Sequence, residues 1–130
     1  MFKKKVFILI VLLMFTSALF LSALQPVLAE TNQKAFNYGM TGSLGPISGF
    51  TRLGVNPDNA RPYITGDIQN RHGQYIGGGA ASGARGSRYI NVVWQYIRAL
   101  DMTPHIIFGA HEVRDGNQYA GGVIYSVYYF

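Results

Sequence analysis

Apolar and polar positions alternate most clearly in the last thirty residues of the chain. The segments "PHIIFGAHEV" and "QYAGGVIYSVYYF" flank a short polar stretch, "RDGN". Within it, Asp115-Gly116 is a dipeptide that tolerates the positive φ angles of a two-residue turn. We therefore predict a C-terminal β-hairpin in which Gly109 pairs with Gly122, Ile107 with Ile124 and His105 with Ser126.

The alternation also predicts which side chains share a face of this hairpin, because successive residues of a strand point to opposite sides. One face would carry Ile106, Phe108, Ala110, Val123, Tyr125, Val127 and Tyr129, and the other His105, Ile107, His111, Ile124, Tyr128 and Phe130. Both faces are largely apolar. We therefore expect either that both are covered, or that one meets a partner or a membrane.

The segment "SRYINVVWQYIRALD" contains two competing patterns. Its polar residues Arg88, Asn91, Gln95 and Arg98 recur at helical spacing. Most of the residues between them are β-branched or aromatic, which favours a strand. We favour the strand, so the predicted class is mainly β: a small antiparallel sheet or sandwich with the C-terminal hairpin. The alternative is an α+β protein with one helix at about 88–100.

The remaining pattern indicates one β-rich domain over residues 47–130, preceded by an irregular N-terminal arm at 30–46. "ISGFTRLGV" and "RPYITGDI" are the expected early strands, and "NPDN" between them has the composition of a turn.

Residues 1–29 have the pattern of a signal peptide rather than of a folded element. Lys3, Lys4 and Lys5 precede an uncharged apolar run, and Val27-Leu28-Ala29 supplies small residues for cleavage. We expect a secreted protein cut near Ala29. Retention as an anchor stays open, because the apolar run is close to the length of a membrane span.

Composition narrows the function classes. The chain has no cysteine, so a secreted domain of this kind must depend on an apolar core. The net charge of +5 includes the three leader lysines, and the remainder keeps only +2. This surplus is too small for a nucleic-acid-binding surface, and we expect no nucleic-acid partner.

The run "GGGAASGARGSR" lacks the third glycine of a dinucleotide fingerprint, and no Gly-Lys-Ser or Gly-Lys-Thr is present. We predict a flexible glycine-rich connection over Gly77 to Gly86, with Arg85 and Arg88 at the tip of a possible binding loop, and no nucleotide or other cofactor.

The sequence assembles no reactive centre that we can identify. His105 and His111 would share a strand face about 20 Å apart, too far to hold one metal ion. No serine lies in a nucleophile-elbow motif. We therefore predict no metal site, no catalytic residues and no enzyme activity.

Two end segments resemble the lactococcin 972 family of secreted bacteriocins. Phe36 to Gly39, "FNYG", is similar to the aromatic-Asn-Tyr-Gly opening of that family, and "YSVYYF" is similar to its last aromatic strand. The resemblance covers about ten residues and does not extend to the middle of the chain. It implies a cysteine-free β-sandwich that binds the cell-wall precursor lipid II in competing cells.

We therefore expect a secreted, bacteriocin-like or envelope-directed protein that acts by binding. Its partner would be a component of the bacterial envelope, a wall precursor or the membrane surface. The alternatives are an exported inhibitor or immunity-type protein with a protein target, and a small secreted hydrolase. The candidate binding surface comprises Arg85, Arg88, Tyr125, Tyr128, Tyr129 and Phe130.

Overall fold

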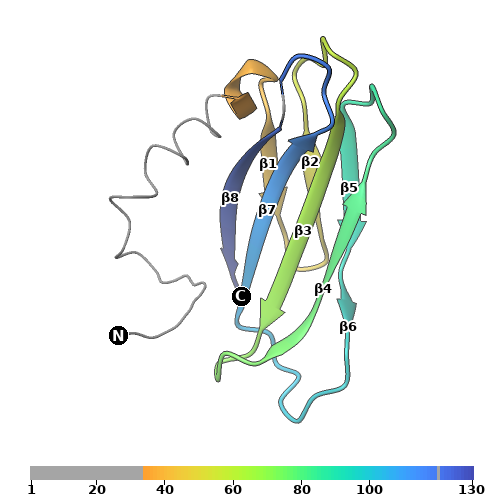
Figure 1. Cartoon of the computed structure of the whole chain (residues 1–130). Coiled ribbons are helices and arrows are strands. Elements are labelled where there is room, and N and C mark those ends of the chain that lie inside the picture. The colour runs from red at the N-terminus through yellow and green to blue at the C-terminus, as the bar shows by residue number, and fades with distance from the viewer. Residues whose placement is uncertain (1–33, 120) are drawn as a thin grey trace, which may run out of the picture. The chain divides into compact units, whose positions relative to one another are not determined.

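The computed structural model describes residues 34–119 and 121–130, which form one short helical turn and eight β-strands (Figure 1). The predicted leader at 1–29 lies outside the described residues. The strands are β1 (Thr41–Leu44), β2 (Ser48–Arg52), β3 (Arg61–Gln69), β4 (Tyr75–Ser82), β5 (Tyr89–Val93), β6 (Gln95–Tyr96), β7 (Ile106–Arg114) and β8 (Gly122–Tyr129). The mainly β prediction is confirmed.

The strands form two antiparallel sheets whose inner faces pack against each other. One sheet has the order β1-β2-β5, and the other has the order β6-β4-β3-β7-β8. Leu44 from the first sheet joins Ile64 and Ile107 from the second in one buried cluster. Figure 1 shows β1 and β2 behind β7 and β3, consistent with these contacts.

The segment with two competing patterns forms two strands, β5 and β6, and the chain passes from one sheet to the other at Trp94 between them. β5 pairs with β2, whereas β6 pairs with β4. The side chains of Ile90, Val92 and Trp94 pack into the core, while Asn91 and Val93 are exposed. The alternative of a helix at about 88–100 is therefore wrong. The helical spacing of the polar residues has no structural role, because strand alternation decides which side chains are buried.

The glycine run is a strand and not a loop, so the predicted flexible connection is corrected. Gly77, Gly78 and Gly79 lie in β4 between β3 and β6. The absence of side chains makes room for neighbours: a Cβ on Gly77 would stand 2.5 Å from the Gln95 carbonyl oxygen, and one on Gly79 would stand 2.8 Å from Val92. Only residues 83–88 remain a connection.

The irregular arm predicted for 30–46 is corrected over its described residues. Residues 34–37 form a helical turn, and β1 pairs with β2. Tyr38 is fully buried, and its hydroxyl lies 2.9 Å from Asp58 Oδ2 and 3.0 Å from the Tyr119 carbonyl oxygen. These contacts connect the arm to the rest of the domain.

The C-terminal hairpin forms, but its predicted register is wrong by four residues. Gly109 pairs with Ser126 and Ile107 with Tyr128, and the connection runs from Asp115 to Gly121. Asp115 has a positive φ of 60° as expected, yet the turn is longer than two residues. Because four is an even number, the shift leaves every side chain on its predicted face.

Candidate binding surface

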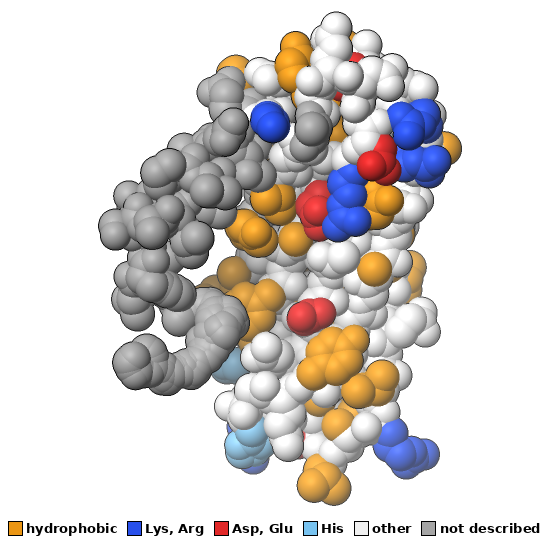
Figure 2. Space-filling model, viewed as in Figure 1, with side chains coloured by type: hydrophobic (Ala, Val, Ile, Leu, Met, Phe, Trp, Pro, Cys, Tyr) orange, Lys and Arg blue, Asp and Glu red, His pale blue; other side chains and the backbone are white. Residues whose placement is uncertain are grey.

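The outward side of β7 and β8 carries large apolar side chains in contact with solvent. In cross-strand pairs, Tyr129 faces Ile106, Val127 faces Phe108 and Tyr125 faces Ala110. Tyr125 and Tyr129 are 68% and 69% exposed, and Phe108 and Val127 are also exposed. We call Phe108, Tyr125, Val127 and Tyr129 the outer aromatic face. Figure 2 views this side of the sheet, where hydrophobic side chains gather over β7 and β8.

The inward residues of the same strands explain why these side chains point outward. Ile107 and Val113 are fully buried in the two apolar clusters of the core. Gly109 lies against Leu44 so closely that an added Cβ would stand 2.7 Å from its side chain. Of the two faces that we expected to be covered or to meet a partner, the inner one is covered. The outer one is exposed among the described residues.

Two carboxylates lie among the rings of the outer aromatic face. Asp67 pairs with Phe108 across β3 and β7, and Glu112 pairs with Val123 across β7 and β8. Desolvation raises the pKa of Asp67. Desolvation, followed by the charge of Glu112, also raises the pKa of Tyr125. The surface therefore combines flat apolar rings with hydrogen-bond acceptors.

Arg114 forms an ion pair with one of these acids, Glu112. Its Nε and Nη2 atoms lie 2.9 Å and 2.8 Å from Glu112 Oε1, and its guanidinium carbon lies 4.1 Å from the centre of the Tyr63 ring. The hydrogen bond to Glu112 raises the pKa of Arg114. Arg114 and Tyr63 therefore border the outer aromatic face on its β3 side.

The six residues predicted as one binding surface do not come together. Tyr125 and Tyr129 share the outer aromatic face. Tyr128 points inward against the core, and its ring forms an edge-to-face pair with Phe130 at 5.3 Å. Phe130 lies at the end of β7 that begins with Ile106, because its N–H donates to the His105 carbonyl.

Arg85 and Arg88 lie at the opposite end of the sheets. Arg85 Nη1 donates to the carbonyl oxygens of Asn59 and Asp115, and Arg88 Nη1 donates to that of Gly54. Asp115 follows β7 and His105 precedes it, so the nine residues of β7 put about 30 Å between these ends. The arginines cannot contact the same small ligand as Phe130.

Four residues of the site were missing from the predicted surface. Phe108 and Val127 shared a predicted face with Tyr125, so the alternation already contained the signal for them. Asp67 and Glu112 had no comparable signal. Asp67 approaches Phe108 only because β3 lies beside β7 in the sheet.

A buried polar cluster crosses the interior between the two sheets. His111 is fully buried; its Nδ1 lies 3.0 Å from Thr51 Oγ1, and its Nε2 lies 2.7 Å from Ser126 Oγ. The Thr51 hydroxyl donates to the Tyr63 carbonyl, so it accepts from Nδ1–H. Nε2 is then the acceptor for the Ser126 hydroxyl.

This arrangement places a serine against an imidazole without the third group of a catalytic triad. The partner of Nδ1 is the Thr51 hydroxyl in place of a carboxylate. Burial lowers the pKa of His111, and a hydrogen bond with the Phe50 backbone opposes this change in part. The cluster satisfies polar groups that would otherwise be buried without partners.

The other histidines do not join this cluster. His72 Nε2 lies 3.7 Å from Asp101 Oδ2, and His105 is exposed. Among residues 34–119 and 121–130, no histidine side chain forms a hydrogen bond or ion pair with both a serine and a carboxylate. In the same residues, no group of three or more histidines and acids could hold a metal ion.

These features define a cysteine-free protein of two antiparallel sheets with exposed tyrosines. Comparison of the chain with protein-family models, curated proteins and solved structures finds no match. In the part of the chain that the structure describes, no helix has the length and hydropathy needed to span a bilayer.

Proposed function

We propose that this is a secreted, envelope-directed binding protein that acts without catalysis, in the manner of a bacteriocin, and that its outer aromatic face binds saccharide chains of the bacterial cell wall. The observation that carries the proposal is the pair of exposed rings of Tyr125 and Tyr129, on one strand beside Phe108. The leader-like N-terminus and the resemblance of "FNYG" and "YSVYYF" to secreted bacteriocins supply the cellular context.

The chemistry of the face favours a saccharide over an anionic bilayer. Tyrosine offers a flat apolar ring and a polar hydroxyl, which suits the apolar ring faces and hydroxyl edges of sugars. The carboxylates of Asp67 and Glu112 can accept hydrogen bonds from hydroxyl groups. Asp67 forms no ion pair with the described residues, so its charge repels anionic lipid headgroups, whereas Arg114 neutralises Glu112.

The two other candidate functions have less support. The exported inhibitor depended on a loop at Gly77 to Gly86, and most of that segment is strand β4. The small hydrolase depended on His72, His105 or His111 meeting a serine or a carboxylate in a cleft. His72 lies 3.7 Å from Asp101 Oδ2, but its side chain is 57% exposed. His111 contacts Ser126, but it is fully buried and has a hydroxyl in the place of the acid.

The test is binding to purified cell-wall sacculi, followed by growth inhibition of related bacteria. Replacement of both rings, Tyr125→Ser with Tyr129→Ser, should lower wall affinity about ten- to hundredfold, because each ring contact contributes about 0.5–1.5 kcal/mol. Tyr89→Ser is the matched control, since Tyr89 is an exposed tyrosine of the other sheet. Equal binding by the double variant and the native protein would contradict the proposal.

A further inference from the structure

The connection between β6 and β7, residues 97–105, lies at one end of the sheets (Figure 1). It places large apolar side chains in solvent. Leu100 is 102% exposed, the highest value among the exposed large hydrophobic residues, and Ile97 and Met102 are also exposed. At this end of the molecule, Figure 2 shows a hydrophobic side chain at the lower edge and a Lys or Arg side chain at the lower right, with uncharged surface between them. We call Ile97, Leu100 and Met102 the apolar tip.

The backbone on either side of the apolar tip is held by hydrogen bonds to the five-stranded sheet. The Ile97 N–H donates to the Ile76 carbonyl at 2.9 Å, and the His105 N–H donates to the Gln69 carbonyl at 2.8 Å. Ala99 packs against the core. The loop is therefore attached at both ends and near its middle.

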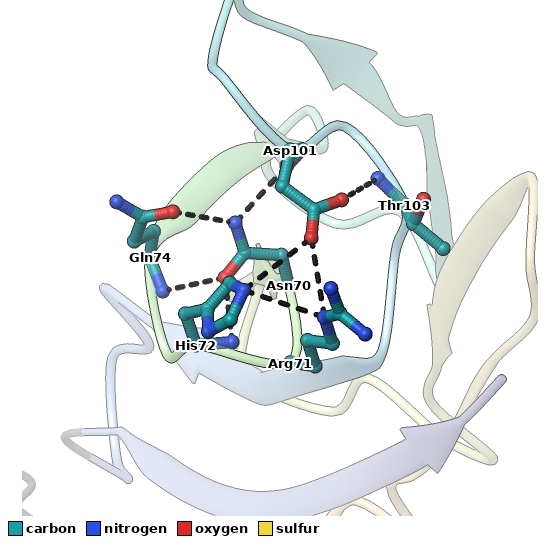
Figure 3. A network of polar contacts seen from close by, with 6 residues as sticks. All are labelled: Asn70, Arg71, His72, Gln74, Asp101 and Thr103. Carbon is teal, nitrogen blue, oxygen red and sulfur yellow. Dashed lines mark hydrogen bonds and ion pairs between the residues drawn. The ribbon is translucent and has the colours of Figure 1, made fainter.

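The side chain of buried Asn70 forms a hydrogen bond to the backbone of the loop that carries the apolar tip (Figure 3). Its Nδ2 donates to the Asp101 carbonyl at 3.0 Å, and its Oδ1 accepts from the N–H groups of His72 and Gln74. This amide joins the β3–β4 turn to the loop. Leu100, the residue before Asp101, is thus held in water by an ordered backbone.

The charged residues around the apolar tip differ in whether they have an ion-pair partner. The Asp101 carboxylate accepts from the Thr103 N–H at 3.0 Å and lies 3.5 Å from Arg71 Nε. The Thr103 hydrogen bond, with smaller effects of Arg71 and His72, holds the pKa of Asp101 below its usual range. Arg98 is exposed and forms no ion pair with any residue that the structure describes.

An exposed leucine alone needs no explanation, since folded proteins expose much apolar surface. Three large apolar side chains within six residues, on an ordered loop beside an uncompensated arginine, form a pattern that folding does not require. Apolar residues with flanking cations match the interface of an anionic membrane, where acyl chains meet phosphate groups.

We propose that the apolar tip is a membrane-contact site that enters the interfacial layer of an anionic phospholipid bilayer, with Arg98 reaching lipid phosphates. This surface differs from the outer aromatic face in both chemistry and position. It carries a free cation where the outer aromatic face carries Asp67 and Glu112. The inference therefore does not depend on saccharide binding, and either can fail alone.

The absence of cysteine allows a test at single positions in the full chain. Leu100→Cys, labelled with an environment-sensitive fluorophore, is mixed with vesicles of phosphatidylglycerol and phosphatidylethanolamine. Ser82→Cys, exposed on β4, is the matched control. We expect a blue shift and a severalfold rise in emission at position 100 and no change at position 82. Fluorescence of Trp94, the only tryptophan, verifies that each variant is folded, and Met102→Cys replaces Leu100→Cys if that variant does not fold.

Comparison of the labels at positions 100 and 82 distinguishes vesicle binding by the apolar tip from vesicle binding by the N-terminal apolar segment. If that segment alone held the protein on vesicles, the protein would sediment with them while the label at position 100 stayed in water. That result would overturn the proposal. An equal response at positions 100 and 82, or no binding to the vesicles at all, would also overturn it. Arg98→Gln should reduce affinity for these vesicles about fivefold, while Arg52→Gln, at an exposed arginine of β2, should not.

Discussion

The indole of Trp94 covers Gly66 so closely that a Cβ added to this glycine would stand 2.6 Å from two ring atoms. Trp94 is the residue at which the chain passes between the sheets, and Gly66 lies near the middle of β3. The indole Nε1–H also donates to the Gly45 carbonyl at 2.9 Å. One side chain thus connects β3, the β5–β6 junction and the β1–β2 turn.

Gly66→Ala should therefore destabilise the protein by about 1–3 kcal/mol, because a methyl group would force the indole or the backbone to move. Urea unfolding, followed by Trp94 fluorescence, measures the change in the free energy of unfolding. The matched control is Gly45→Ala, whose Cβ would meet only the Ser48 carbonyl oxygen at 3.4 Å. Equal stability of the two variants would show that the contact with Trp94 is not a tight one.

The buried His111 predicts a dependence of stability on pH. Burial lowers its pKa in the folded state from the ordinary 6.5, so the unfolded chain binds more protons as the solution is acidified. The free energy of unfolding should consequently be highest above pH 6.5 and should decrease as the pH falls from there through the folded-state pKa.

Chemical denaturation between pH 7.5 and pH 5 measures this effect, and His111→Gln should reduce it. His72→Gln is the control, because the His72 side chain is 57% exposed and outside the cluster. NMR titration of the imidazole provides a second measurement that needs no variant. A midpoint for His111 at or above 6.5 would contradict the prediction.

Tyr38 and Asp58 predict a separate dependence at lower pH. Burial raises the pKa of Tyr38, and the hydrogen bond to Asp58 adds to this change. Burial alone would raise the pKa of Asp58, but the N–H groups of Tyr119 and Gln118, with the Tyr38 hydroxyl, together lower it. Because a carboxylate with a lowered pKa stabilises the folded state, its contribution is lost as the solution becomes more acidic than pH 3.8.

Tyr38→Phe removes one donor to the buried carboxylate and should cost about 1.5–3 kcal/mol, as for hydrogen bonds to charged groups. The pKa of Asp58 should rise toward its ordinary value, so acid unfolding should begin at a higher pH than in the native protein. Circular dichroism during acid titration measures this midpoint. Tyr96→Phe, at an exposed tyrosine, should leave the midpoint unchanged, and an unchanged midpoint in Tyr38→Phe would refute the argument.

The sequence pattern predicted part of the candidate binding surface. Alternation places Phe108, Tyr125, Val127 and Tyr129 on one face, and a register error of an even number of residues leaves them there. It could not identify which face is exposed, since both faces are apolar. That outcome depends on the other sheet, whose Leu44 covers Gly109. The separation of Arg85 from Phe130 also depends on tertiary contacts.

The sequence by itself determined the β class, the strands of the C-terminal hairpin and the assignment of its side chains to faces, because these depend on local properties: β-branching, aromatic content and a period of two. The tertiary structure decided the register, because Asp58 accepts hydrogen bonds from Gln118 and Tyr119 and holds the connection in a longer form. It also decided that Gly77, Gly78 and Gly79 form a strand, because close neighbours leave no room there for side chains. Such contacts join residues far apart in the chain, and no local pattern encodes them.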